Sequence, residues 1–136
     1  MIEFEVKEKV MPIGEKAGQT VYFAAPKMVQ RITSKQMEDD VVRITSLARG
    51  DVRNTLTTVA ELVNSALERG ASVDLGDLGS LRVVIGSQMM DKPEDVTAAT
   101  LKTPGVRFTP KQEMLNAAKK VKVKVTNKYN KTTSEG

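Results

Sequence analysis

The 136-residue chain has no cysteine, histidine or tryptophan, and aromatic residues make up 4% of it. Without cysteine there is no disulfide framework, thiol nucleophile or cysteine-based metal site. Without histidine the chain lacks the commonest general base and the commonest transition-metal ligand. No apolar run approaches the roughly 18 residues of a membrane span, and no apolar leader is evident. We therefore expect a cytoplasmic protein with no metal, cofactor or membrane partner.

Catalytic motifs are equally scarce. Ser, Lys and Asp could in principle form a hydrolytic dyad, but the sequence has no nucleophile motif, phosphate-binding glycine loop or metal-ligand spacing. The pair Gly76 and Gly79 is too short a signal for a nucleotide-binding loop. We therefore expect a protein that is not an enzyme.

Charge is unevenly distributed along the chain. Residues 1–101 carry 12 Lys and Arg against 15 Asp and Glu, which gives −3. Residues 102–136 carry 9 against 2, which gives +7, so the whole chain is at +4. A basic last third on a near-neutral body suggests a polyanionic partner, although a solvated lysine-rich tail would give the same pattern.

Two helices are predicted in the first half of the chain. Thr33-Ser-Lys-Gln36 matches a capping box, and the helix after it should end near Ser46. A second helix over residues 49–69 has Asp51 in its first turn and Gly70 as its stop. Its apolar stripe comprises Val52, Leu56, Val59, Leu62, Val63, Ala66 and Leu67. This stripe exceeds what one short helix and a small sheet can cover, which favours a dimer.

The segment after the second helix predicts a reversal and a long hairpin. Gly76 and Gly79 bracket a tight turn, because glycine tolerates the positive φ angles that such turns often need. The strands are expected over residues 72–75, then 80–90 and 96–108 as the two limbs of the hairpin. Pro110 fits the first turn of a last helix that runs to about Lys120.

Both ends of the chain alternate as strands do. Residues 2–6 alternate apolar with acidic, residues 121–125 alternate apolar with basic, and residues 20–24 form a third strand stopped by Pro26. We expect residues 1–25 to dock on the body and Thr126–Gly136 to be disordered. The expected cross-strand partners are Glu3 and Glu5 with Lys122 and Lys124, and Phe4 and Val6 with the valines. Lys122 and Lys124 are then either structural strand charges or phosphate contacts.

The order helix, helix, glycine turn, long hairpin, helix resembles the bacterial HU/IHF histone-like DNA-binding family. Residues 72–83 resemble its strand-turn-strand signature, and Phe108-Thr-Pro-Lys-Gln-Glu-Met114 resembles the segment that joins the second arm to the last helix. The resemblance covers roughly residues 33–120. The flanking strands are extra to ordinary HU and are similar to an HU-related subfamily common in Bacteroidetes-type bacteria.

The resemblance implies an α+β fold: two N-terminal helices, a three-stranded sheet with a long β-arm, a C-terminal helix and extra terminal strands. It implies an N-terminal strand extension (1–32), an HU-like domain (33–120) and a C-terminal strand with a disordered basic tail (121–136). It also implies an intertwined homodimer in the bacterial nucleoid, whose two arms embrace double-stranded DNA through the minor groove. Such binding has little sequence preference, because minor-groove readout is degenerate and affinity comes from phosphate charge and DNA deformability.

The DNA-binding residues that follow from the resemblance are Arg82, Lys92, Pro93, Lys102, Arg107 and Lys111. In the family a proline at the arm tip wedges between base steps; Pro93 is either such a wedge or an ordinary turn residue. The chain departs from the family in its arm, where residues 87–103 hold two lysines against three acidic residues. Thr109 also stands where arginine is usual, and Lys111 where glycine is usual.

Two functions therefore remain open. The first is architectural, nucleoid-associated DNA binding and DNA condensation by a homodimer. The alternative is an HU-fold structural or protein-interaction module that has lost strong DNA binding, which the acidic arm tip favours.

Overall fold

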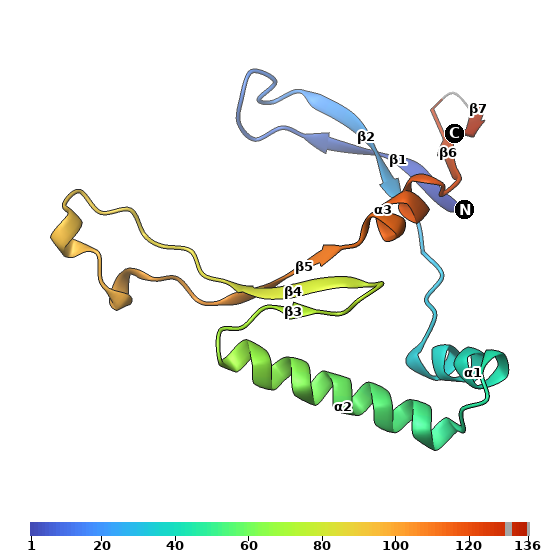
Figure 1. Ribbon diagram of the computed structural model, residues 1–136. Helices are drawn as coiled ribbons and strands as arrows, with labels where there is room; N and C mark the ends of the chain where they lie inside the picture. The colour runs from blue at the N-terminus through green and yellow to red at the C-terminus, as the bar shows by residue number, and fades with distance from the viewer. Residues whose placement is uncertain (130–131, 136) are drawn as a thin grey trace. The chain divides into compact units, whose positions relative to one another are not determined.

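The structure is a computed structural model that describes residues 1–129 and 132–135. Within them the chain forms three α-helices and two small sheets (Figure 1). It divides into two compact units, one made of residues 1–32 with the chain from residue 116 onward, the other of residues 33–115. The described helices include none that is both long and apolar enough to cross a membrane.

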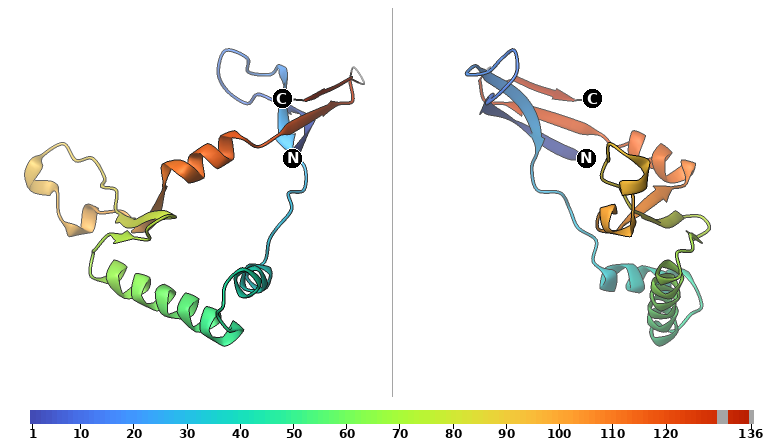
Figure 2. Two further views of the ribbon diagram at one scale, coloured as in Figure 1. Left: turned by 45° about the vertical axis from the view of Figure 1, so that its right-hand side comes forward. Right: turned by 90° about the vertical axis from the view of Figure 1, so that its left-hand side faces the viewer.

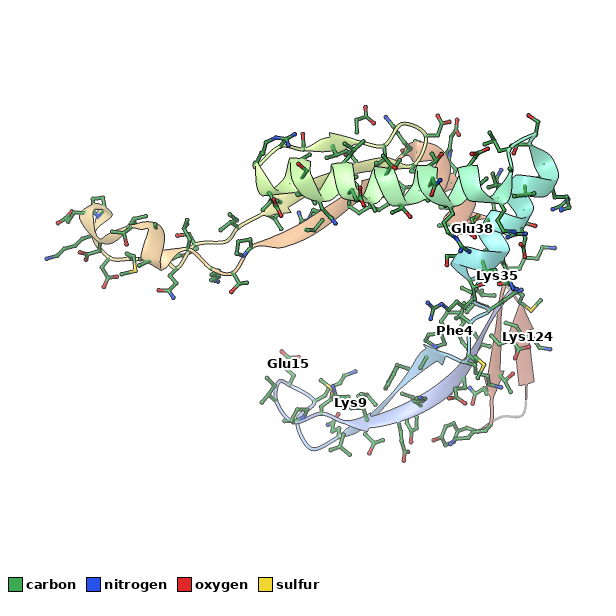
Figure 3. The ribbon with its side chains drawn as sticks, turned by 90° about the horizontal axis from the view of Figure 1, so that it is seen from below. Phe4, Lys9, Glu15, Lys35, Glu38 and Lys124 are labelled. Carbon is green, nitrogen blue, oxygen red and sulfur yellow. The ribbon has the colours of Figure 1, made fainter. Side chains whose placement is uncertain are left out.

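The first unit is a four-stranded sheet in the order β2-β1-β6-β7. β1 (Ile2–Val10) and β2 (Thr20–Pro26) form an antiparallel hairpin. β1 also pairs in parallel with β6 (Val123–Asn127), which pairs with β7 (Thr132–Glu135). Figure 3 labels Phe4 on β1 and Lys124 on β6. The expected pairing of the N-terminal strand with the C-terminal strand is confirmed, whereas docking of residues 1–25 on the body of the protein stays a prediction.

The parallel register decides which side chains meet. Glu3 lies opposite Lys124 and Phe4 opposite Val125, as predicted. Glu5 lies opposite Thr126, so the expectation that it faces a lysine is wrong. The cause is the direction of pairing: in this register the chain before Val123 lies beyond Ile2, whose N–H donates to the carbonyl of Lys122 at 2.8 Å.

The predicted disorder from residue 126 onward is also wrong for most of that segment. β6 continues to Asn127, and residues 132–135 form β7. Pairing with β1 and β7 satisfies backbone groups that a free tail would leave to water. Residues 130, 131 and 136 lie outside the described part of the chain.

The second unit begins with α1 (Ser34–Ile44) and α2 (Arg49–Glu68). The predicted capping box is confirmed: the Gln36 N–H donates to Oγ1 of Thr33 at 3.2 Å, and the Thr33 N–H donates to Oε1 of Gln36 at 2.8 Å. The predicted stop at Gly70 is confirmed as well. Gly70 has a φ of 77°, and its N–H and that of Ala71 donate to carbonyls of the last helical turn at 2.9 and 3.0 Å.

An ion pair joins the two helices. Glu38 of α1, labelled in Figure 3, is 7% exposed and accepts hydrogen bonds from Nε and Nη2 of Arg53 at 3.3 and 3.1 Å. These hydrogen bonds and the charge of Glu38 raise the pKa of Arg53. A second pair joins Arg49 to Asp39. The position of α1 relative to α2 therefore depends more on these arginine–carboxylate ion pairs than on an apolar core.

The second sheet has the order β3-β4-β5, with β3 (Val73–Asp74), β4 (Gly79–Val84) and β5 (Gly105–Pro110). α2 runs alongside this sheet in Figures 1 and 2. α3 (Gln112–Lys119) follows β5. Pro110 is the last residue of β5 and not part of the helix, which corrects its predicted place. As an edge-strand residue it needs no N–H for the sheet.

The predicted hairpin limbs are too long. Regular pairing of β4 with β5 ends at Val84 and Gly105, and an isolated bridge follows between Ser87 and Leu101. Beyond it, Pro93–Asp95 and Ala98–Thr100 form two 3-10 turns, so strand over residues 88–90 and 96–100 is wrong. Pro93 opens the first turn and cannot donate to a ladder. Thr97 and Thr100 close the second in a reciprocal cap.

Gly79, at the start of β4, gives the first stability prediction. Its φ is +149°, and a Cβ there would collide with the carbonyl oxygen of Thr109 and lie 2.9 Å from the Phe108 ring. We expect Gly79→Ala to lower the free energy of unfolding by about 2 kcal/mol or more, measured by urea denaturation. Gly50→Ala is the control, because nothing lies within 4 Å of that Cβ and alanine favours helix. Equal stability of the two variants would contradict the steric argument.

Candidate nucleic-acid interface

Two arginines lie directly opposite each other on the second sheet. The register pairs Arg82 of β4 with Arg107 of β5. Both are exposed, and within the described residues neither forms an ion pair or a side-chain hydrogen bond. Like charges directly across a strand pair destabilise the sheet. An anion bound next to both arginines would offset the repulsion between their charges.

The alternation of the strands gives the sheet two different faces. The arginine pair shares its face with the neighbouring pairs Ser80–Thr109 and Val84–Gly105. The other face carries Leu81 opposite Phe108 and Val83 opposite Val106. The hydrogen-bonded strand pair thus holds the arginines on the more polar face of the sheet, and the other face is apolar and available for packing.

A hollow of about 400 Å³ adjoins this face. Arg82 and Lys111 both line it, together with the hydroxyl-bearing Ser80 and Thr109. Asp74, opposite Ser80, also lines it, and its Oδ1 accepts a hydrogen bond from the Gly76 N–H at 2.9 Å. The Lys111 N–H donates to the carbonyl of Leu78 at 3.0 Å, which ties the start of α3 to the β3–β4 turn. The structure therefore brings Arg82, Arg107 and Lys111 into one region. Cations beside hydroxyl donors suit a phosphate group.

Lys102 lies farther out, where the chain leaves the regular sheet. Its N–H donates to the carbonyl of Gly86 at 2.8 Å, and its side-chain carbons lie over Gly86, which has no Cβ to obstruct them. Lys102 thus extends the basic region beyond the ends of β4 and β5.

Lys92 and Pro93 belong to a different environment at the tip of the segment between β4 and β5. Lys92 precedes the first 3-10 turn and Pro93 is its first residue, with Glu94 and Asp95 next in the chain. Pro93 is exposed and sits in a turn. Its role as a DNA wedge, like the DNA contacts of the other five residues, stays a prediction.

Sequence reasoning missed Ser80 and Thr109 as members of the site. Thr109 drew attention as a departure from the family pattern, but the register places its side chain on the arginine face opposite Ser80. Side chains alternate between the two faces of a strand. Counting two residues back from Arg82 and two residues on from Arg107 would therefore have identified Ser80 and Thr109 as neighbours on the same face. The described residues contain no group of three or more Cys, His, Asp and Glu suited to a metal ion.

An apolar groove of about 480 Å³ lies elsewhere in the same unit. It is lined along α2 by Leu56, Val59, Leu62 and Val63, and by residues of β3 and the turn after it: Val73, Asp74, Leu75 and Leu78. Leu62 is 66% exposed, although it belongs to the predicted apolar stripe. The stripe therefore remains largely uncovered in a single chain.

Comparison with known proteins gives a family and a structural relative. The model of the HU-HIG family, described as an HU domain fused to a wHTH, Ig or glycine-rich motif, matches residues 1–125. A solved structure described as a "Putative bacterial DNA binding protein" from Bacteroides vulgatus ATCC 8482 is similar, with a TM-score of 0.61 and 17% identity. The match covers 93% of this chain and 48% of that one, so the chain spans about half that protein's length. No curated protein matches.

Proposed function

Because the chain belongs to the HU-HIG family, we propose that it is a homodimeric, non-enzymatic HU-like protein of the bacterial nucleoid. Its proposed role is to bind the backbone of double-stranded DNA through the β4–β5 region, with little sequence preference. The residues proposed to make the contacts are Arg82, Arg107, Lys102 and Lys111, with Lys92 and Pro93 at the tip as secondary contacts.

The observation that carries this proposal is the opposed arginine pair. Two exposed guanidinium groups held across a strand pair with no carboxylate partner destabilise the protein by themselves. Arginine makes bidentate contacts with phosphate, so a DNA backbone supplies the missing counter-charge at a spacing set by the sheet. The Ser80 and Thr109 hydroxyls on the same face add neutral donors.

Exposed surface supports the dimer. Two globular units of these lengths should together expose about 8,400 Å², whereas this chain exposes 11382 Å². Among the side chains whose burial is described, Val52, at 4% exposed, is the one buried apolar side chain. A second chain that covers the α2 groove would supply the missing core.

Salt dependence tests the function directly. We expect a duplex to bind with a log affinity that falls linearly with log salt, at about −0.9 per phosphate contact. Because the basic residues are few, the slope should be shallow, and unrelated sequences should bind alike. Fluorescence anisotropy on plain, nicked and bent duplexes measures both quantities. Absence of binding at low salt, or binding that ignores salt, would contradict the proposal.

The tip gives a variant that should improve binding. Asp91, Glu94 and Asp95 would meet phosphates with like charge, and all three are exposed. We expect the triple variant Asp91→Asn, Glu94→Gln, Asp95→Asn to bind duplex DNA several-fold more tightly at low salt, with the gain disappearing at high salt. The same three-charge change at Glu15, Glu61 and Glu68 is the control. Equal affinity of the tip variant and the wild type would place the tip outside the DNA contact.

That same acidic tip favours a second function, a protein-interaction module that keeps the HU fold. Met89 is fully exposed there, and Val96 and Leu101 are about half exposed. Apolar side chains beside carboxylates suit a basic protein surface better than a phosphate backbone. This function predicts no duplex binding at any salt concentration, and the salt titration therefore separates it from the first.

A further inference from the structure

β2 is an edge strand of the four-stranded sheet and lacks the features that usually prevent pairing with a further strand. β2 pairs with β1 on one side, and within the described residues no strand pairs with its other side. Exposed edges are usually protected by charged residues, bulges or internal proline, because free N–H and C=O groups attract other strands. β2, Thr-Val-Tyr-Phe-Ala-Ala-Pro, has no charged residue, and its proline comes last.

The other described edge strands differ in this respect. β5 carries Arg107 and β3 carries Asp74. β2 is also rich in exposed apolar surface, with Tyr22 57% and Phe23 46% exposed. Unlike both edge strands of the second sheet, β2 is thus uncharged, and it is suited to pair with a further strand.

The pattern of hydrogen bonds between β1 and β2 shows which backbone N–H and C=O groups of β2 point toward β1 and which point away from it. The Lys27 N–H donates to the carbonyl of Glu3 at 2.8 Å, and the Met11 N–H donates to the carbonyl of Gln19 at 3.0 Å. Because bonded pairs alternate along an antiparallel ladder, the odd-numbered residues of β2 face β1. The N–H and C=O groups of Thr20, Tyr22 and Ala24 therefore point away from the sheet.

We propose that β2 is a self-association edge, at which the β2 strands of two copies of this chain pair antiparallel about a twofold axis near Phe23. In that register Phe23 faces Phe23 of the second copy, Tyr22 faces Ala24, and Val21 faces Ala25. No like charges meet, and aromatic and β-branched pairs stabilise strand pairing. The strand is complementary to itself, which is what a twofold interface requires.

Two further observations favour the addition of a strand at this edge, and the self-complementarity of β2 favours a second copy as the one that supplies it. No side chain of the first unit whose burial is described is fully buried, so this sheet gains packing from any added strand. The Tyr22 ring is also held in place: it contacts the Tyr129 ring edge-on, with centroids 5.2 Å apart. The Tyr129 hydroxyl donates to Glu8 at 3.4 Å. An edge with ordered side chains loses less entropy on pairing. This surface is separate from the α2 groove and needs no DNA.

Cysteine cross-linking tests the proposal cleanly, because the chain contains no cysteine. Single variants Tyr22→Cys, Phe23→Cys and Ala24→Cys are oxidised mildly and the covalent dimer is followed on non-reducing gels. In the proposed register only Phe23→Cys places two cysteines directly opposite each other, with Cα atoms about 4.5–5.5 Å apart, within the range that a disulfide spans. Tyr22→Cys and Ala24→Cys place theirs diagonally across the axis. We expect Phe23→Cys to cross-link fastest of the three, and at least about tenfold faster than Met89→Cys, an exposed control in the other unit.

Two second-site substitutions at Ala24 test whether the outward edge of β2 is the interface that is cross-linked. Ala24→Pro removes an outward N–H without removing a bond to β1, and Ala24→Lys places like charges near each other across the axis. Either change, added to Phe23→Cys, should reduce cross-linking to the control rate. The cross-link should persist without DNA and in a Leu62→Asp background, which separates this proposal from the proposed function. Rates equal to the control in all three cysteine variants, or no effect of both Ala24 changes, would overturn it.

Discussion

Replacing the two opposed arginines, Arg82→Gln with Arg107→Gln, is expected to reduce duplex affinity on the order of a hundredfold at low salt. A dimer loses four cationic groups, so the salt slope should become shallower by about 0.9 for each of them that contacts a phosphate. The loss should be the same for every DNA sequence, because phosphate contacts carry no base information. Anisotropy titrations at several salt concentrations measure both effects.

The same double variant should be slightly more stable than the wild type. Removing like charges directly across the β4–β5 pair relieves a repulsion of up to about 1 kcal/mol. A loss of binding accompanied by a small rise in Tm would show that the arginines are retained for a ligand and not for folding.

The matched control removes the same charge from the same unit. Arg43 is paired with Asp40, and Arg69 with the Ser65 hydroxyl, so both already have partners. Arg43→Gln with Arg69→Gln should leave the salt slope nearly unchanged. If control and test variants lose affinity equally, binding depends on net charge alone, and the arginine face has no special role.

Leu62→Asp is expected to abolish the dimer at micromolar concentration while costing the isolated chain little. Leu62 is 66% exposed in one chain, so a carboxylate there stays hydrated. In a dimer that covers the α2 groove, two leucines lose about 1.5–3 kcal/mol of burial each, and two unpaired charges are buried. The dimer dissociation constant should therefore rise on the order of a thousandfold or more.

Light scattering across a dilution series measures this effect, and circular dichroism reports the helix content. Thr57→Asp is the control, because at 100° per residue position 57 lies on the opposite side of α2 from the apolar stripe. It should remain dimeric. A wild-type chain that is a stable, folded 14.9 kDa monomer at micromolar concentration would reject the dimer altogether.

Local features of this fold could be predicted because their causes lie within a few residues. The Thr33–Gln36 capping box depends on two side chains three positions apart, and the helix end at Gly70 depends on one residue that accepts positive φ. The strand at Ile2–Val6 was found from its period-two alternation, although β1 continues to Val10.

Features that depend on pairing between distant segments could not be obtained in that way. The placement of Arg82 opposite Arg107 depends on how the 20 residues from Ile85 to Pro104 close between β4 and β5, and that segment was expected to be more extended than it is. The parallel offset of β1 against β6 likewise joins opposite ends of the chain, and changed the expected partner of Glu5.

The physical difference is one of range. Residue chemistry fixed the helix caps, the alternation of strands and the basic and acidic segments, because short-range sterics, hydrogen bonds and charge counts act whatever the rest of the chain does. Strand register decided which charges face each other on β4 and β5, and strand order decided that β2 has a free edge. Register and order are set by long-range pairing, in which a shift of one residue moves every side chain to the other face.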